Sequence, residues 1–449
     1  MRRGILIIAL VAACDPTSGR SVRPDDELIS EGGPAGDDGG ADATVPERCA
    51  IPGDTRCEGE DVLMTCGPGA TMESTTCALG CSPTPVARCR VFAPSGPVTS
   101  GDATAAGLAS ITFATGTTIN GATGEIVGVR AAGEGVANGI GFRVAQRTSA
   151  GGVSYAVGIF SFESLMIASG VELALRGANS VALVAGKHVQ IDGVIDARGD
   201  CAGVSGGPGG FAGGAANTAG LGPGGGQVAS GVGTTDPGGG GGGYAAPGGR
   251  GGPTATGIYS VAGVVYGDAE LTDLLGGSGG ADGFNGGVNG GGGGGGAVQI
   301  VSLRDVTIGG GPSVGGINAG GCGGFASAGS GGGGGSGGAI VVEAPRIILA
   351  GNGVLAANGG GGGGAEVTAA VRQHGALGAS PAPAAGSGGG AGGAGASPAG
   401  KDGSKPGGAA GGGGGGCGRI KLRAFDPIDL RGVVSPAIGS GATAKSEGG

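Results

Sequence analysis

Three aspartates at four-residue intervals, Asp192, Asp196 and Asp200, form the set in this sequence that most resembles catalytic machinery. Lys187 and Arg198 lie close to them. Paired carboxylates can act as general acid and base on a glycosidic bond, or they can bind calcium. Later repeats of the chain carry Gly, Ala or Arg where Asp192 stands, so no ladder of acids builds up. The sequence favours solvated residues at the edge of a structure over a reaction centre.

Other catalytic devices lack their residues. The chain has only two histidines, His188 and His374, and neither accompanies a GxSxG nucleophile motif. The phosphate-loop pattern is absent, and the tandem GGxGxDxUx repeats of calcium-binding chains do not occur. We therefore expect no catalytic residues, no metal and no cofactor, and we expect that the protein is not an enzyme. A polysaccharide lyase or hydrolase that uses the three aspartates is the alternative.

Cysteines are the next reactive group. Six of them fall within residues 49–90, a segment with no CxxC pair and no histidine, which disfavours zinc. An even, dense set in an exported chain indicates a disulfide module, although six cysteines allow fifteen pairings. Cys201 and Cys322 follow their repeats at nearly equal offsets and are a further candidate pair, which leaves Cys417 over. The six candidates in the module are Cys49, Cys57, Cys66, Cys77, Cys81 and Cys89.

The first fourteen residues predict export. Two arginines precede an uncharged aliphatic run of ten residues, which is too short to span a bilayer and is typical of a signal peptide. The run ends in Val11-Ala-Ala-Cys14, which resembles the lipobox of bacterial lipoproteins. That resemblance implies cleavage before Cys14 and lipidation of its sulfur. Two or more acyl chains would hold the protein stably at a membrane.

Composition separates the next part of the chain from the rest. Residues 15–48 are acidic and rich in Pro, Gly and Ser, and we expect a disordered tether. Gly accounts for 122 of the 449 residues, and Trp is absent. The net charge is −9, without a basic block, which disfavours nucleic-acid binding.

The elements that must position these residues come from an internal repeat. Alternating apolar residues that begin at Val181 recur in the same frame from Val298, Ile340 and Ile420. Because each copy is too small to fold alone, the copies must stack. We therefore predict an all-β fold, a parallel β-solenoid of the right-handed β-helix type, over residues 171–440. Residues 91–170 would form a capping β-region, and residues 441–449 a disordered tail.

Long Gly-rich stretches separate the copies, at about 200–256, 276–296, 320–338 and 359–416. We interpret them as loops of the solenoid. They can be mobile coil, or they can be extended polyproline-II-like chains that pack closely because Gly has no Cβ atom. The sequence leaves both possibilities open.

Lipobox, acidic tether, Cys-rich module and Gly-rich repeats together resemble Gram-negative surface lipoproteins of the PE-PGRS-like type, through segments such as GGPGGFAGGAANTAG. The chain has no helical PE domain. The resemblance implies a lipid-anchored protein of the cell envelope. We favour the outer membrane or cell surface over the inner membrane, although Asp15, directly after Cys14, leaves that choice open. We expect a structural or adhesive role toward polysaccharide or a neighbouring cell surface. A flexible Gly-rich spacer is the other alternative.

Overall fold

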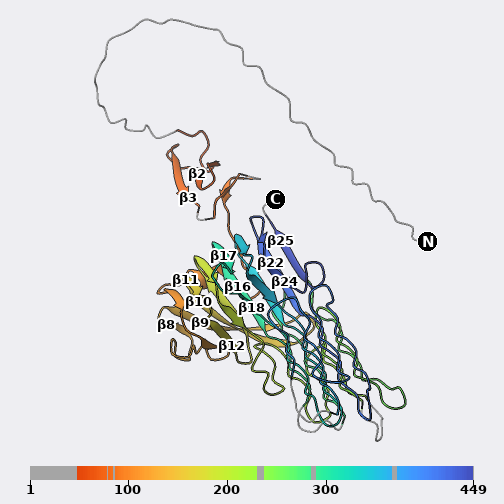
Figure 1. Cartoon of the computed structure of the whole chain (residues 1–449). Coiled ribbons are helices and arrows are strands. Elements are labelled where there is room, and N and C mark those ends of the chain that lie inside the picture. The colour runs from red at the N-terminus through yellow and green to blue at the C-terminus, as the bar shows by residue number, and fades with distance from the viewer. Residues whose placement is uncertain are drawn as a thin grey trace, which may run out of the picture.

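The computed structural model describes residues 48–77, 79–83, 86–229, 237–284, 290–366 and 372–447. The described residues are mostly strand and extended chain, with one helix, α1 (Ser100–Ala103). The predicted signal peptide, the lipidation site Cys14 and all but the last residue of the predicted tether lie outside the described residues. Three large sheets, a small Cys-rich module and a body of Gly-rich chain make up the structure (Figure 1).

Each large sheet takes strands from the whole length of the repeats. The eight-stranded sheet contains β8 (Gly135–Ala137), β9 (Ile140–Thr148), β10 (Ser154–Phe162), β13 (Ser180–Ala185), β16 (Ala297–Ser302), β19 (Ala339–Glu343), β22 (Arg419–Ala424) and β25 (Ala442–Ser446). The second sheet, here the β6 sheet, contains β6 (Ser110–Phe113), β11 (Ser164–Ile167), β14 (His188–Ile191), β17 (Asp305–Ile308), β20 (Arg346–Leu349) and β23 (Asp429–Leu430). The third, the β7 sheet, contains β7 (Thr117–Asn120), β12 (Glu172–Arg176), β15 (Val194–Asp196), β18 (Gly315–Asn318), β21 (Gly353–Ala356) and β24 (Val433–Ser435).

The repeat copies pair in the register in which their sequences align. Val181 lies opposite Val298, Val298 opposite Ile340, and Ile340 opposite Ile420, all in parallel pairs of the eight-stranded sheet. These four side chains are fully buried in one hydrophobic cluster that all three sheets share. The alternating apolar pattern therefore builds a core because strand residues two apart point to the same face of a sheet.

The predicted parallel β-solenoid of the right-handed β-helix type, with Gly-rich loops, is wrong. The strands form three separate sheets, and the eight-stranded one is mixed, because β8, β9 and β10 are antiparallel neighbours. The Gly-rich segments are not loops around a continuous wall of strands. They fill about two thirds of residues 171–440 and pack against one another in a separate body that the alternating pattern could not reveal (Figure 1).

This separate body, here the glycine bundle, comprises the described residues of 197–296, 319–338 and 357–418. Each of the three segments leaves the end of a strand of the β7 sheet and returns to the start of a strand of the eight-stranded sheet. Its described backbone contains isolated β-bridges but no helix or strand. The bundle extends from one end of the sheets (Figure 1).

Hydrogen bonds in the glycine bundle follow a period of three. The amides of Gly331, Gly334 and Gly337 donate to the chain at 410–416, whereas Gly332, Gly335 and Gly338 donate to the chain at 319–325. Gly333 and Ser336 donate to a third chain, at 278–281. An extended chain with three residues per turn points successive amides in three directions. One segment is therefore hydrogen-bonded to three neighbouring segments, whereas a strand inside a sheet is bonded to two.

Close contacts in the bundle require glycine. A Cβ atom on Gly333 would lie 2.0 Å from the carbonyl oxygen of Gly240, and one on Gly412 would lie 2.0 Å from that of Gly332. Neither distance is possible for real atoms, so only Gly fits where chains approach this closely. The Gly runs are therefore a packing requirement.

The Cys-rich module lies at the other end of the sheets from the glycine bundle (Figure 1). Its antiparallel strands are β1 (Thr55–Glu58), β2 (Val62–Cys66) and β3 (Met72–Thr76), with a second pair, β4 (Cys81–Ser82) and β5 (Arg88–Cys89). Three disulfides hold them together, Cys49–Cys66, Cys57–Cys81 and Cys77–Cys89.

The segment after the module is fixed to the eight-stranded sheet. Phe92 is buried against Phe425, with ring centroids 5.2 Å apart, and Arg423 lies over the Phe92 ring. Glu343, fully buried, accepts a hydrogen bond from the Ser95 amide and pairs with Arg423 at 3.1 Å. These contacts occur at the ends of strands β19 and β22, whereas the glycine bundle joins their beginnings.

Residues outside the repeats belong to the same sheets. β10, from the predicted capping region, pairs in parallel with β13 of the first repeat. The chain end differs from the expected disordered tail, because Ala442–Ser446 forms β25 and pairs with β22. Alternation of Ala and Thr with Lys there gives too weak an apolar pattern to predict a strand.

Candidate functional site

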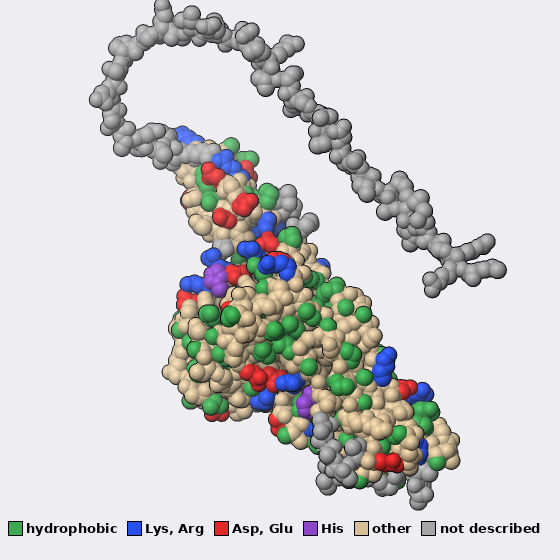
Figure 2. All heavy atoms as spheres, in the orientation of Figure 1, with side chains coloured by type: hydrophobic (Ala, Val, Ile, Leu, Met, Phe, Trp, Pro, Cys, Tyr) green, Lys and Arg blue, Asp and Glu red, His purple; other side chains and the backbone are tan. Residues whose placement is uncertain are grey.

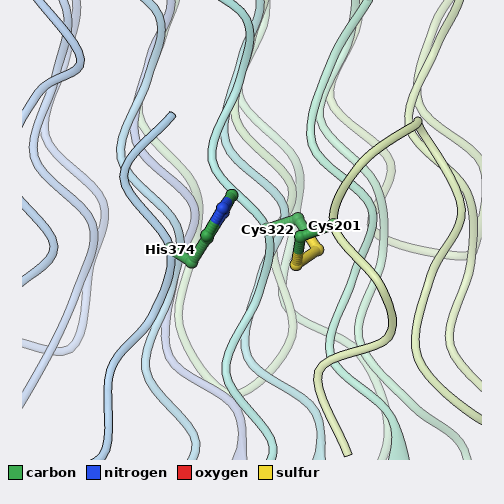
Figure 3. A group of neighbouring side chains, drawn as sticks. All are labelled: Cys201, Cys322 and His374. Carbon is green, nitrogen blue, oxygen red and sulfur yellow. A yellow bond between two sulfur atoms is a disulfide. The ribbon is translucent and has the colours of Figure 1, made fainter. Parts of the chain in front are cut away.

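A disulfide cross-links the glycine bundle near its base, where its segments leave the β7 sheet. Cys201, which follows β15, and Cys322, which follows β18, form a disulfide with a Cα–Cα distance of 5.3 Å (Figure 3). It closes a loop across a sequence separation of 121 residues. The disulfide joins the two cysteines that their nearly equal offsets within the repeats had predicted as a pair. It links the first segment of the glycine bundle (197–296) to the second (319–338).

The third segment of the glycine bundle (357–418) reaches the disulfide through His374 and Arg372. His374 lies beside the disulfide (Figure 3), and its Nδ1 atom accepts a hydrogen bond of 3.0 Å from the Gly323 amide. Arg372 donates from Nε to the Gly323 carbonyl at 2.9 Å, and it also donates to the Cys201 carbonyl. Its guanidinium lies 3.7 Å from the centroid of the Phe325 ring. All three segments of the glycine bundle are therefore connected beside the disulfide.

Charge and burial keep His374 neutral. Burial and, to a smaller extent, the neighbouring cations Arg372 and Arg198 together lower the pKa of His374 to about 4. The ligand atoms of Cys201, Cys322 and His374 lie within 4.8 Å of one another, which is the spacing of a metal centre. Metal binding by cysteine requires thiolates, however, and both sulfurs are spent in the disulfide. The arrangement is suited to cross-linking.

The three aspartates of the first repeat have separate tasks. Asp196 is buried and pairs with Arg198 at 2.8 Å and with Arg176 at 3.5 Å. Asp192 accepts hydrogen bonds from Gln190 and from the Gly311 amide, and Asp200 accepts one from the Ala202 amide. Carboxylates engaged with different partners do not form an acid and base aimed at one bond.

A cleft of about 940 Å³ lies between the Cys-rich module and the sheets. His188 lines it and contacts Asp305, with 2.5 Å between Nδ1 and Oδ1. Arg304 and Arg346 lie on the sheet side, whereas Glu60 lies on the module side. Figure 2 shows basic and acidic side chains mixed at this narrowing of the molecule. Charges of both signs give the cleft no clear preference for an anion or a cation.

An apolar strip runs along the outside of the glycine bundle, and we call it the apolar ridge. It consists of Ile258, Tyr259, Val261, Val264 and Val265, which are each between 40% and 59% exposed. Ser260 and Gly263, between them in sequence, are buried instead. A chain with three residues per turn turns one residue in three inward and leaves the others outside. Consecutive exposed apolar residues are a mark of contact surfaces.

Arg250 and Asp402 brace the chain near the ridge. The Arg250 guanidinium lies 4.4 Å from the centroid of the Tyr259 ring and pairs with Asp402 at 2.8 Å. The carbonyl of Val261 accepts a hydrogen bond from Gln227, and the Gly263 amide donates to Gly241. The ridge is therefore held in place from below by backbone bonds while its side chains stay exposed.

Sequence reasoning missed the ridge because GIYSVAGVVYG reads as a short apolar strand with ambiguous period. The one sequence signal for the ridge was the three-residue spacing of its small residues, and that spacing is informative only for a chain that packs beside glycine segments.

Within the described part of the chain, no helix has the length and apolar character needed to cross a membrane. The chain matches no protein-family model, no curated protein and no solved structure.

Proposed function

We propose that this protein is a non-catalytic cell-envelope protein with a structural or adhesive role. In this proposal a lipid at Cys14 anchors it to the envelope, and the glycine bundle carries the contact surface. The partner is the surface of a neighbouring cell or an extracellular polysaccharide. The observation that carries the proposal is the position of the glycine bundle at the opposite end of the sheets from the N-terminal module (Figure 1).

Rigidity along the molecule supports this assignment. A tether that enters at the module leads into Phe92 and Ser95, which are locked to the eight-stranded sheet by Phe425 and Glu343. At their other ends the strands of that sheet continue into the glycine bundle. A contact surface on the bundle is thereby held away from the point of attachment. Dense hydrogen bonding within the bundle does not favour the flexible-spacer alternative.

The separate engagement of Asp192, Asp196 and Asp200 supports a non-catalytic role over the polysaccharide-acting enzyme. Exposed valines on the ridge supply apolar area that a partner would bury, at roughly 25 cal/mol per Å². Adhesion by many copies on one cell would add strength through multivalency.

The anchor is tested in a Gram-negative host that expresses the full chain and is grown with labelled fatty acid. We expect the label in the protein and the protein in the membrane fraction, and we expect Cys14→Ser to lose both. An unlabelled wild-type protein in the soluble fraction would exclude the lipid anchor.

The contact surface is tested by cell–cell aggregation and by binding to purified envelope polysaccharide. We expect the double variant Val261→Ser/Val264→Ser to reduce adhesion about tenfold or more, which corresponds to about 1.4 kcal/mol per contact. The matched control is Val127→Ser/Val136→Ser, because these valines are also about half exposed but lie outside the bundle. Equal adhesion by both double variants, or none by wild-type cells, would contradict the proposed role.

A further inference from the structure

A second cavity lies between the turn that joins β9 to β10 and the first segment of the glycine bundle (197–296). It has a volume of about 420 Å³, which is within the range of small-molecule sites. Ser149 and Val153 line one side, and Tyr244, Tyr266 and Leu271 line the other. We call it the tyrosine pocket.

The walls of the tyrosine pocket are apolar because its polar wall groups are used internally. The rings of Tyr244 and Tyr266 are stacked, with centroids 4.5 Å apart. The Tyr244 hydroxyl donates to the Leu275 carbonyl at 3.0 Å, and the Tyr266 hydroxyl donates to the Gly276 carbonyl at 2.5 Å. Ring atoms and the side chains of Leu271, Leu275 and Pro223 remain to face a ligand. Such a surface favours a ring or a hydrocarbon chain.

Two carboxylates, Asp268 and Asp273, line the same pocket, and within the described residues neither is paired with a lysine or an arginine. Asp273 accepts hydrogen bonds from the Ala150 amide at 3.1 Å and from the Tyr155 hydroxyl at 3.4 Å. Asp268 accepts hydrogen bonds from the Thr272 hydroxyl at 2.6 Å and from the Thr272 amide at 3.3 Å.

The nearest cations are committed elsewhere. Arg419 donates to the carbonyls of Tyr266 and Gly267, at 2.9 and 3.1 Å. Lys421 donates to the Glu270 carbonyl at 2.6 Å, and its Nζ lies 3.5 Å from the Glu270 carboxylate. Arg419 also attracts the Asp268 carboxylate electrostatically, whereas Asp273 forms no ion pair with a described lysine or arginine. The pocket therefore combines aromatic and aliphatic walls with a carboxylate, Asp273, that lacks a cationic partner among the described residues.

We propose that the tyrosine pocket binds a small amphiphilic cation, an organic amine whose apolar ring or chain lies against Tyr266 and Leu271 and whose ammonium group faces Asp273 and Asp268. An ammonium group would give Asp273 a cationic partner, and it is attracted to ring faces as well as to carboxylates. This ligand is independent of the lipid anchor and of the apolar ridge, so the site stands whether or not the protein is adhesive.

The test compares 2-phenylethylamine with 2-phenylethanol, which has the same ring and chain but no charge, by calorimetric titration of the full chain. We expect the amine to bind at least about tenfold more tightly, with affinity that falls as salt is added. For Asp273→Asn we expect the two affinities to converge. Glu125→Gln, an exposed carboxylate outside the pocket, is the matched control and should leave the preference intact.

A blocking variant guards against a folding defect in Asp273→Asn. Gly151 lines the pocket from an exposed turn, where an added Cβ meets nothing closer than 3.8 Å, so Gly151→Phe should fill the mouth and abolish binding without unfolding the chain. Equal or tighter binding of the alcohol would overturn the proposal. So would the absence of amine binding at millimolar concentration, or amine binding that Gly151→Phe leaves unchanged.

Discussion

Single residues at the base of the glycine bundle show how strongly burial sets their chemistry. His374 is half-buried and Cys417 is fully buried, and in each case the neutral form is the one that burial favours. The sequence singled out both residues by type but gave no sign that they are buried. A histidine in a Gly/Ala-rich stretch looks exposed until the chain segments around it are known to be packed.

The stability of the protein should depend on the protonation of His374. The unfolded chain takes up this proton as the pH falls through 6.5, whereas the folded chain takes it up only near pH 4. The stabilisation is therefore complete above about pH 6.5 and is lost as the pH falls toward 4, by no more than about 3 kcal/mol.

Urea unfolding of the wild type and of His374→Gln at pH 7 and pH 5 measures this effect. We expect the wild type to lose more stability than the variant over that interval. His188→Gln, at an exposed histidine, is the control. Parallel losses in all three proteins would show that His374 does not carry a shifted pKa.

Cys417 should be inert in the folded protein. It is the free cysteine among the described residues, and burial raises the pKa of its thiol to about 12. At pH 8 it is therefore protonated as well as inaccessible, and only a thiolate reacts quickly.

In a Cys14→Ser background, a maleimide reagent at pH 8 should leave the native protein unlabelled and should add one label after unfolding in guanidinium. Rapid labelling of the native chain would mean that this part of the bundle is open.

At the scale of elements, the sequence predicted the strands far better than the chains between them. Alternating residues identified the four repeat copies and their register, from Val181 through Val298 and Ile340 to Ile420. Six clustered cysteines predicted a disulfide module, although their pairing came only from the structure. The pairing of Cys201 with Cys322 was suggested by equal offsets within the repeats.

Glycine runs carried no such information. A run of identical residues has no pattern of faces, so neither its neighbours nor its direction can be read from it. The arrangement depends on which amide of Gly331 to Gly338 meets which distant carbonyl, and that is a property of the folded molecule. For the same reason the apolar ridge and the tyrosine pocket, which lie on or beside the bundle, could not be predicted.

Alanine substitutions should separate packed glycines from ordinary ones. In Gly333→Ala the new methyl group would lie 2.0 Å from the Gly240 carbonyl oxygen, so neighbouring chains must move apart. We expect a loss of about 1–3 kcal/mol or more, as for overpacked cores.

Gly351→Ala is the matched control, because its Cβ would meet nothing within 4 Å and its φ is not in the left-handed region. Its effect should stay within about 0.5 kcal/mol. Denaturant unfolding compares the two variants. An equal effect at both positions would mean that the glycine at 333 is not in close contact with another chain.

At the scale of the whole molecule, the sheets and the glycine bundle lie end to end and use their backbone hydrogen bonds differently. In the sheets, side chains from alternating positions fill a hydrophobic core, whereas in the glycine runs of the bundle the backbone packs directly against backbone. The disulfide Cys201–Cys322 and the contacts of Arg372 join the three segments of the bundle to one another near the β7 sheet. A chain with few aromatic residues can thus form an extended, ordered body.

Order in the glycine bundle is the central claim, and hydrogen–deuterium exchange measures it most directly. Every amide from Gly331 to Gly338 and from Gly411 to Gly418 donates a backbone hydrogen bond to another part of the chain. The structure predicts that both segments exchange slowly, with protection comparable to β16 and β19 of the sheet. If they exchange as fast as the exposed turn at 131–134, the glycine segments are mobile coil and the packed bundle does not exist in solution.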